Sequence, residues 1–311
     1  YLRRLLVSFS IAKTPSLKGK TALVTGGNIG LGFETVKALA SKGAHVLLAA
    51  RNEEKGKAAV AEIQKLVPNA HVELLRLDLA SQRSIRAAAA EVGNKFSQLD
   101  LLINNAGIMA MPETFTEDGY ESQFGVNHLG HWSLTALLMD NLKAADAARV
   151  VTVTSTAHHL IWNVNFDDPH MRRKYSAWNA YSQSKLANYY FALGLHKVFS
   201  AGDGKMKSLL AHPGLSHTNL QVKTYEMGAG GWAGGFFKNL AAKTGMSPKD
   251  GALPQIRAAL DPHAKSGEFY APRFVTTGSP VKRPILRTNN QRNIAKLWEL
   301  SEKETGISIK P

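Results

Sequence analysis

The chain has 311 residues, 44% of them hydrophobic, which indicates a globular protein with a sizeable core in one large α/β domain or two small ones. It has no cysteine, which excludes disulfides, cysteine-based metal sites and a thiol nucleophile, and suits a reducing compartment. The net charge of +14 leaves nucleic acid, anionic lipid or a phosphorylated ligand open as partners.

The first twenty residues combine two arginines with a short, interrupted apolar stretch. No apolar run in the chain approaches the roughly 20 residues needed to span a bilayer. We expect residues 1–17 to form a flexible leader, and weak contact of residues 1–16 with a membrane surface is the alternative. The expected location is therefore the cytoplasm, with peripheral attachment to a membrane left open.

From Thr21 onward, leucine-rich or β-branched runs alternate with helical patterns, which indicates βαβ units around a parallel sheet. We predict a single doubly wound (Rossmann) domain over residues 18–275, with a central parallel sheet of about seven strands and helices on both faces. Residues 276–311 are expected to form a C-terminal extension. The predicted strands are 21–25, 45–50, 71–77, 99–106, 149–155, 207–212 and 267–271.

One segment breaks this alternation, at about residues 221–246. It is rich in glycine and carries Trp232, Phe236 and Phe237. Glycine supplies mobility and aromatic rings supply contact area, so the segment is predicted to be a lid over an apolar ligand. An irregular surface insertion is the alternative.

A glycine-rich turn joins the first strand to the first helix in "TALVTGGNIGLG", residues 21–32. Its spacing is T-G-x-x-x-G-x-G, and it lacks the G-K-[ST] of a Walker loop. Glycines allow a tight turn and close approach of the backbone to a ligand, while the helix N-terminus offers free N–H groups to a pyrophosphate. The predicted dinucleotide-binding residues of this turn are Gly26, Asn28, Ile29, Gly30 and Gly32.

The end of the second strand favours one dinucleotide over the other. An NAD site usually has a carboxylate there, which binds the adenosine ribose hydroxyls. This chain has Ala50 at that position, followed by Arg51 and Asn52. An arginine pairs with a 2′-phosphate that a carboxylate would repel. NADP(H) is therefore the preferred cofactor, NAD(H) stays open, and a merely exposed Arg51 is the alternative.

"AYSQSKLANYY" places Tyr181 four residues before Lys185, which is one turn apart on a helix. The two side chains are either an ordinary solvent-facing pair or the two halves of a proton donor. Tyr175 also precedes a serine, but position 179 is asparagine rather than lysine, so Tyr181 is preferred.

These motifs, taken in order, resemble the short-chain dehydrogenase/reductase family over about residues 18–275, and most of all its retinol-dehydrogenase-like and protochlorophyllide-reductase-like branch. The resemblance rests on "TGGNIGLG" (25–32), "LDL" (77–79), "NNAG" (104–107), Asn127 in "FGVNHLGHW", Ser155 in "VVTVTSTAHH", "YSQSK" (181–185) and "HPGLSHT" (212–218).

The resemblance implies three groups of cofactor contacts besides the glycine turn. Asp78, with Leu79, would lie at the adenine amine. Asn105 would brace the central strands next to the cofactor, with Ala106 and Gly107 beside it. The residues bordering the nicotinamide and its carboxamide would be Pro213, Gly214 and Thr218.

The resemblance also implies a catalytic tetrad of Asn127, Ser155, Tyr181 and Lys185, of which Tyr181 and Lys185 also contact the cofactor. Reduction of a carbonyl requires a proton for the developing alkoxide, and a free phenol has a pKa of about 10. We expect the Lys185 ammonium and the oxidised nicotinamide to lower the pKa of Tyr181. Ser155 would hydrogen-bond the substrate oxygen, and Asn127 would anchor a water that resupplies Lys185 with protons.

Two departures accompany the resemblance. Twenty-five residues separate Ser155 from Tyr181, about twice the spacing of shorter members, so Thr154 or Thr156 is an alternative source of the hydroxyl. Protochlorophyllide reductases depend on cysteines that this chain lacks, which argues against light-driven chemistry.

The predicted function is an NADP(H)-dependent oxidoreductase that interconverts an alcohol and a carbonyl on a bulky hydrophobic substrate; an NADP(H)-binding regulator with a vestigial site is the alternative.

His158 and His159 line the substrate mouth or lie at the surface, and no metal is predicted because they lack further ligands. No nucleic-acid partner is expected, since the basic residues are dispersed. A homo-oligomer formed through helices near Tyr181 is a further expectation.

Overall fold

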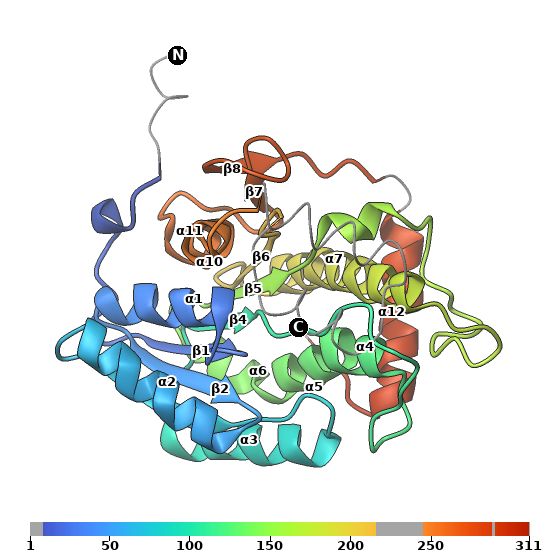
Figure 1. Cartoon of the computed structure of the whole chain (residues 1–311), viewed down its shortest axis with the longest axis horizontal. Helices are drawn as coiled ribbons and strands as arrows, with labels where there is room; N and C mark the ends of the chain where they lie inside the picture. The colour runs from blue at the N-terminus through green and yellow to red at the C-terminus, as the bar shows by residue number, and fades with distance from the viewer. Residues whose placement is uncertain (1–8, 216–244, 288–289, 311) are drawn as a thin grey trace.

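The computed structural model describes residues 9–215, 245–287 and 290–310. A single eight-stranded sheet forms the centre, in the order β3-β2-β1-β4-β5-β6-β7-β8 (Figure 1). All neighbouring strands are parallel except β7 and β8, which are antiparallel. The strands are β1 (Thr21–Thr25), β2 (His45–Ala50), β3 (His71–Arg76), β4 (Leu101–Asn104), β5 (Arg149–Val153), β6 (Lys207–Ala211), β7 (Phe269–Pro272) and β8 (Pro280–Arg283).

The seven predicted strands are confirmed, and their ends differ for a structural reason. The predicted strands 99–106 and 149–155 are longer than β4 and β5 because their last residues leave the sheet and turn into the site. β8 was missed: it has only four residues, "PVKR", of which two are charged. It pairs on one side only, and a proline at the first position of an edge strand is compatible with such a place.

Helices cover both faces of the sheet, as predicted. Asn52, Ser81 and Ser176 each accept a backbone N–H in the first turn of a helix, which fixes where α2, α3 and α7 begin. The helices are α1 (Gly30–Ser41), α2 (Glu53–Leu66), α3 (Gln82–Lys95), α4 (Ser122–Phe124), α5 (Gly130–Leu137), α6 (Met139–Lys143), α7 (Ala177–Ala201), α10 (Pro248–Gly251), α11 (Leu253–Leu260) and α12 (Asn290–Thr305).

The core forms two clusters, one on each face of the sheet. One cluster joins the sheet to α1, α2 and α11, through side chains such as Val36, Ile63 and Ile256. The other joins it to α3, α5, α7 and α12, through side chains such as Ile85 and Trp132. A parallel sheet is buried on both faces, which explains its continuous runs of Leu, Val, Ile and Ala.

The two ends of the domain are less separate than the sequence indicates. Within the predicted leader, Phe9 and Ile11 pack against the first core cluster, and the Arg257 guanidinium lies 5.8 Å from the Phe9 ring centroid. Residues 1–8 lie outside the described residues, so membrane contact through 1–16 stays a prediction.

The C-terminal segment contributes β8 to the sheet and α12 to the second core cluster. The Trp298 ring lies edge-on to Trp132, with centroids 4.8 Å apart. Trp132 Nε1 also donates a 2.9 Å hydrogen bond to the carbonyl of Ile307. A methyl group at Gly194 of α7 would come within 2.1 Å of the Trp298 ring, which shows how closely α12 approaches α7.

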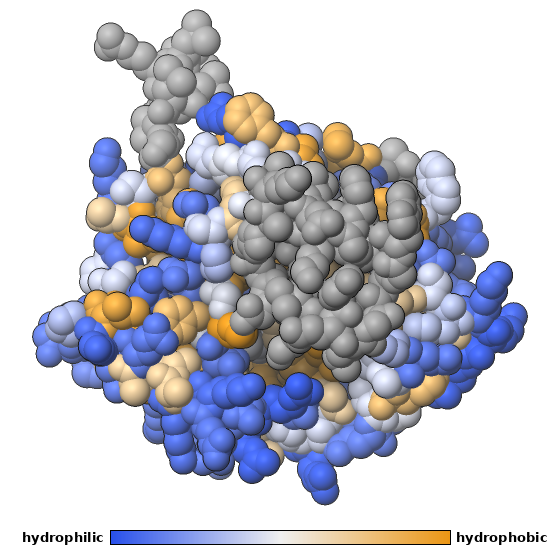
Figure 2. All heavy atoms as spheres, viewed as in Figure 1, coloured by the Kyte–Doolittle hydropathy of each residue, from blue (hydrophilic) through white to orange (hydrophobic). Residues whose placement is uncertain are grey.

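Hydrophilic residues dominate the lower edge of the molecule in Figure 2, over α3, whereas apolar residues are interspersed with them at the left. Among the residues that the structure describes, no helix has the length and apolarity needed to cross a membrane.

Candidate active site

The predicted site residues converge at the carboxyl ends of β1, β4 and β5. Gly26 follows β1, Asn105 follows β4, and Ser155 lies two residues beyond β5. The chain reverses its direction of winding between β1 and β4, because β1 pairs with β2 on one side and β4 on the other. In open α/β sheets, ligands bind in the crevice at this switch point.

The glycine turn has the backbone approach that a dinucleotide requires. Gly26 has φ +65°, a conformation that side-chain-bearing residues rarely adopt. At Gly32, a Cβ would lie 2.1 Å from the Gly26 carbonyl oxygen and 2.7 Å from Asn105 Nδ2. The residue before α1, Ile29, makes no side-chain capping bond to the helix N-terminus. A pyrophosphate therefore fits this turn, with the first-turn N–H groups of α1 as donors.

The predicted contacts for the adenosine half of the cofactor differ in whether their side chains are free to bind it. The Arg51 side chain is exposed and has no hydrogen-bond or ion-pair partner among the described residues. Asn52 Oδ1 accepts the Lys55 N–H at 2.8 Å, so this side chain caps α2. Asp78 Oδ1 accepts the Ala80 N–H at 3.0 Å. The Leu79 side chain is buried in the core, so only its backbone can reach a cofactor.

Asn105 ties the ends of β1 and β4 together. Its Nδ2 donates to the Thr25 carbonyl at 2.8 Å, and its backbone N–H donates to Thr25 Oγ1 at 2.9 Å. The neighbouring Ala106 N–H donates to the same hydroxyl at 2.9 Å. Gln255 of α11 completes this arrangement, since its Nε2 donates to Asn105 Oδ1 at 3.0 Å.

Gly107 lies between two members of the predicted tetrad. A Cβ at this position would be 3.1 Å from Asn127 Oδ1 and 3.2 Å from Lys185 Nζ. The Asn127 side chain is fixed by three hydrogen bonds: Oδ1 accepts the Ile108 N–H at 2.8 Å, and Nδ2 donates to the Ile108 carbonyl and to Ser184 Oγ, both at 2.9 Å. The structure thus places the side chains of Asn127 and Lys185 next to the same residue, Gly107.

Tyr181 and Lys185 are both buried in the first half of α7, with 6% and 4% of their surfaces exposed. The alternative of a solvent-facing pair is therefore wrong. Lys185 Nζ lies 5.8 Å from the Tyr181 ring centroid and donates to the Val153 carbonyl at 3.4 Å. The Ser155 side chain acts on the Tyr181 phenol and partly offsets the rise of its pKa on burial.

Burial shifts the pKa values of both residues. Desolvation raises the pKa of Tyr181 above its ordinary value, and the hydrogen bond from Ser155 lowers it again in part. This direction applies to the protein alone, and a lowering of the pKa by Lys185 together with the oxidised nicotinamide stays a prediction. Desolvation also lowers the pKa of Lys185 to about 8. The ammonium is thus close to losing its proton at neutral pH, which suits a group that exchanges protons.

The alternative residues have other roles. Thr154 Oγ1 is buried and donates to the Lys185 carbonyl at 2.7 Å. Tyr175 Oη donates to the Met111 carbonyl at 2.7 Å, accepts from Gln123 Nε2 at 2.9 Å, and has a raised pKa because it is desolvated. Neither the Thr154 hydroxyl nor the Tyr175 phenol is therefore placed to replace Ser155 or Tyr181.

The long segment between Ser155 and Tyr181 is anchored to α7. Gln183 accepts the Asn165 N–H at 2.9 Å through Oε1 and donates to the Pro169 carbonyl at 2.7 Å through Nε2. The ring of His158 is buried and stacks on Tyr189, with centroids 4.8 Å apart, so a surface position is wrong for this histidine. Within the described part of the chain, no three potential ligands cluster around a metal site.

The nicotinamide-side residues are only partly described. Gly214 N–H donates to His212 Nδ1 at 2.9 Å, and the Leu215 N–H donates to the Thr276 carbonyl at 2.9 Å. Pro213 immediately precedes this turn. Thr218 and most of the predicted lid at 221–246 lie outside the described residues.

Three residues that connect the predicted site residues were not predicted from the sequence: Thr25, His131 and Ser184. His131 is fully buried in α5, with Nδ1 2.9 Å from the Asn127 carbonyl and Nε2 2.8 Å from Thr25 Oγ1. His131 could have been predicted from its spacing of four residues from Asn127, which places both residues on one helical face.

The buried histidines make a testable prediction about acid stability. Desolvation lowers the pKa of His128 to about 3 and that of His131 to about 4, against about 6.5 in an unfolded chain. The unfolded state then binds more protons below pH 6.5, so stability falls as the pH is lowered from 6.5 toward 4. Between pH 7 and pH 5 we expect each histidine to remove roughly 1–2 kcal/mol from the free energy of unfolding.

Urea unfolding at pH 7, 6 and 5 measures this loss. The substitution His128→Gln removes one titrating group and should flatten the pH dependence by its share. A free energy of unfolding that stays constant over this range would contradict the protonation states assigned to the two rings.

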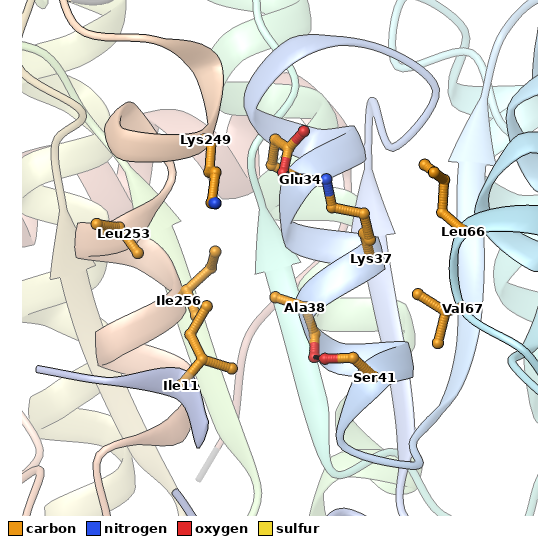
Figure 3. Close-up of a pocket in the computed structure, with 10 residues that line it drawn as sticks. All are labelled: Ile11, Glu34, Lys37, Ala38, Ser41, Leu66, Val67, Lys249, Leu253 and Ile256. Atoms are coloured by element: carbon orange, nitrogen blue, oxygen red, sulfur yellow. Dashed lines mark hydrogen bonds and ion pairs between the residues drawn. The ribbon is translucent and has the colours of Figure 1, made fainter. Parts of the chain in front are cut away.

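A surface pocket of about 290 Å³ lies elsewhere, between α1, the end of α2 and α10–α11 (Figure 3). Ile11, Leu253 and Ile256 form part of its wall, with the Lys249 and Lys37 side chains at one end. None of the predicted site residues lines it, so it is separate from the catalytic arrangement.

The fold and site together define a nicotinamide-dinucleotide oxidoreductase built on a doubly wound sheet. The model of the short-chain dehydrogenase family matches residues 20–227, and the chain belongs to this family.

Three proteins illustrate the similarity. Retinol dehydrogenase 13 of Homo sapiens is 44% identical over 303 residues, covering 94% of this chain and 86% of that protein. Polyprenol dehydrogenase of Homo sapiens is 36% identical over 315 residues, covering 98% and 91%. A crystal structure of an uncharacterized protein from Mycobacterium paratuberculosis aligns with a TM-score of 0.78 and 37% identity, covering 98% of this chain and all of that one.

Proposed function

We propose that this protein is an NADP(H)-dependent oxidoreductase that interconverts an alcohol and a carbonyl on a bulky hydrophobic substrate. The observation that carries the proposal is the buried Tyr181, one helical turn from Lys185, whose ammonium lies next to Gly107. When bound, the nicotinamide dinucleotide gives or takes the hydride. The protein supplies the proton and the orientation.

In the reducing direction, Tyr181 acts as the general acid and passes its phenolic proton to the oxygen of the carbonyl. The Ser155 hydroxyl donates a hydrogen bond to the same oxygen and holds it near the phenol. The ammonium of Lys185 stabilises the phenolate that results. Since burial raises the pKa of Tyr181, the resting phenol keeps its proton until the substrate oxygen develops negative charge.

Asn127 is proposed to anchor a water that returns a proton to Lys185. Both hydrogens of its Nδ2 are used by Ile108 and Ser184, so the second lone pair of Oδ1 remains as the contact for such a water. The position of Oδ1 next to Lys185, on either side of Gly107, supports this role.

The preference for NADP(H) rests on Arg51, which is exposed at the end of β2 with no carboxylate at position 50. We expect Arg51→Ala to weaken NADPH binding by roughly tenfold or more, since a hydrogen-bonded charge contact contributes about 1.5–3 kcal/mol. Binding of NADH should change less than about twofold, because it has no 2′-phosphate for the guanidinium to contact.

Fluorescence titration of both dinucleotides measures the change. Arg292→Ala removes an equally charged, exposed side chain from α12 and serves as the control. Equal losses of NADPH and NADH affinity in Arg51→Ala would overturn the role in selectivity.

The proposed substrate class draws on the relatives, which are named for the alcohols retinol and polyprenol. The aromatic residues of the predicted lid motivate the same expectation. Oxidation of NADPH in the presence of hydrophobic aldehydes and ketones tests it, with small polar carbonyls as the comparison. If none of these compounds accelerates NADPH oxidation, the proposed activity is wrong.

A further inference from the structure

His131 is a buried histidine that the proposed chemistry does not use, yet both of its nitrogens contact the site. It lies in α5, one helical turn after Asn127, and none of its surface is exposed. Nδ1 is 2.9 Å from the backbone carbonyl of Asn127, and Nε2 is 2.8 Å from Thr25 Oγ1. Thr25 is the last residue of β1, directly before the glycine turn.

The hydrogen-bond partners determine the tautomer of this ring. A carbonyl oxygen can only accept, so Nδ1 carries the hydrogen. The neutral ring then leaves Nε2 as an acceptor, and burial keeps the ring neutral by lowering its pKa to about 4. Thr25 Oγ1 already accepts from the N–H groups of Asn105 and Ala106, so its own hydrogen is available for Nε2. The Ile103 carbonyl, at 3.3 Å from that oxygen, is the more distant acceptor.

The carbonyl that His131 binds belongs to an unusual turn. Residues Gly125–Leu129 form a π-helix, in which the Gly130 N–H bonds the Gly125 carbonyl five residues back. Such widened turns insert one extra residue into a helix and alter the direction in which its side chains point. Here the turn directs the Asn127 carboxamide toward Ile108 and Gly107, where Lys185 Nζ also lies.

We propose that His131 is a positioning residue for Asn127: its imidazole joins the main chain of the π-helix to the end of β1 and thereby fixes the carboxamide next to Lys185. The series of hydrogen bonds runs from the N–H groups of Asn105 and Ala106 through Thr25 and His131 to Asn127. This inference rests on the proposed function, because it assigns a supporting residue to the same site.

Substitutions at position 131 separate the two contacts of the ring. Asparagine places its amide nitrogen near the position of Nδ1 and can still donate to the Asn127 carbonyl. Glutamine reaches toward the Thr25 hydroxyl instead, and phenylalanine keeps the ring but removes both bonds. We expect His131→Phe to lower kcat, measured per bound NADPH, by roughly tenfold or more, since small displacements of catalytic groups have effects of this size or larger. His131→Asn should recover most of the loss, and more of it than His131→Gln.

The dissociation constant for NADPH should stay within about twofold in all three variants, because the pyrophosphate turn itself is unchanged. His128→Gln is the matched control. His128 is also fully buried in the π-helix, but its Nε2 bonds Ser301 of α12 and not Thr25. It should affect stability and leave kcat per bound NADPH unaltered.

A double-substitution cycle with Thr25→Val tests the connection through the hydroxyl. If the series is real, Thr25→Val should lower kcat less in the His131→Phe background than in the unmodified protein. The inference is overturned if His131→Phe retains the unmodified kcat per bound NADPH, if His131→Gln recovers more than His131→Asn, or if the two effects on kcat are independent. Should one variant fail to fold, the order of the other two still decides.

Tyr181→Phe is measured beside these variants. If that substitution abolishes turnover while His131→Phe does not change it, the assignment of His131 alone is wrong. If Tyr181→Phe retains full turnover, the proposed function is wrong instead.

Discussion

Replacing Tyr181 by phenylalanine should abolish turnover while leaving cofactor binding intact. The substitution removes a single oxygen atom from a side chain that is 6% exposed, so the packing of α7 hardly changes. It removes the proton donor, and with it general acid catalysis worth typically 10²–10⁴-fold. We therefore expect kcat to fall by roughly a thousandfold or more, with the dissociation constant of NADPH within about threefold of the unmodified value.

Tyr175→Phe is the matched control for this prediction. That phenol bonds the Met111 carbonyl and Gln123 rather than Ser155, so its loss should affect stability and not the chemical step. Retention of turnover by Tyr181→Phe, or an equal loss in Tyr175→Phe, would show that the proton comes from another group. A regulatory protein with a vestigial site has no turnover to lose, and its Tyr181→Phe variant would keep both NADPH binding and its biological output.

Introducing a methyl group at Gly32 is expected to have the largest effect outside the tetrad. A Cβ there would lie 2.1 Å from the Gly26 carbonyl oxygen, a backbone atom that cannot move without opening the turn. We expect Gly32→Ala to destabilise the domain by about 2–4 kcal/mol, in the range of severe overpacking or backbone strain. The folded fraction should bind NADPH at least tenfold more weakly, since the turn and the N-terminus of α1 separate.

Gly93→Ala provides the control, because it also adds a methyl group to a helical glycine. Position 93 is exposed in α3, and its new Cβ would meet only Asn141 Oδ1, at 3.7 Å. This variant should be more stable by up to about 1 kcal/mol, as alanine is the better helix former. Thermal unfolding and NADPH titration of the two variants measure both effects, and equal melting temperatures would show that the turn tolerates a side chain.

The sequence predicts the sheet well because its signals are local. The strands β1, β2 and β5 are runs of Ala, Leu, Val and Thr, long enough to be recognised one at a time and regularly spaced by helical patterns. The edge strand β8 has no such run, and its place in the sheet depends on pairing with β7. Its four residues carry no pattern that a single sequence reveals.

In the site, too, local patterns can be predicted from the sequence, and contacts between distant segments cannot. Tyr181 and Lys185 are recognisable because their spacing is that of one helical turn, and the glycine turn because its residue types are restricted. Thr25, His131 and Asn127 meet through contacts up to 106 residues apart in the chain. Nothing in the local sequence indicates which histidine faces which threonine. Burial of the Tyr181 phenol, which raises its pKa in the protein alone, is likewise a property of the assembled fold that the local sequence does not reveal.

The docking of α12 on α7 has a consequence for biosynthesis. Trp298 lies directly over Gly194, and Ile307 accepts the indole hydrogen of Trp132, so the last part of the chain closes one face of the core. A nascent chain leaves the ribosome N-terminus first, so Phe191 and Trp132 lack this cover until α12 has been synthesised. The helix that carries Tyr181 therefore acquires its final outer packing only after α12 has been synthesised, and truncation before residue 290 would leave an aggregation-prone polypeptide.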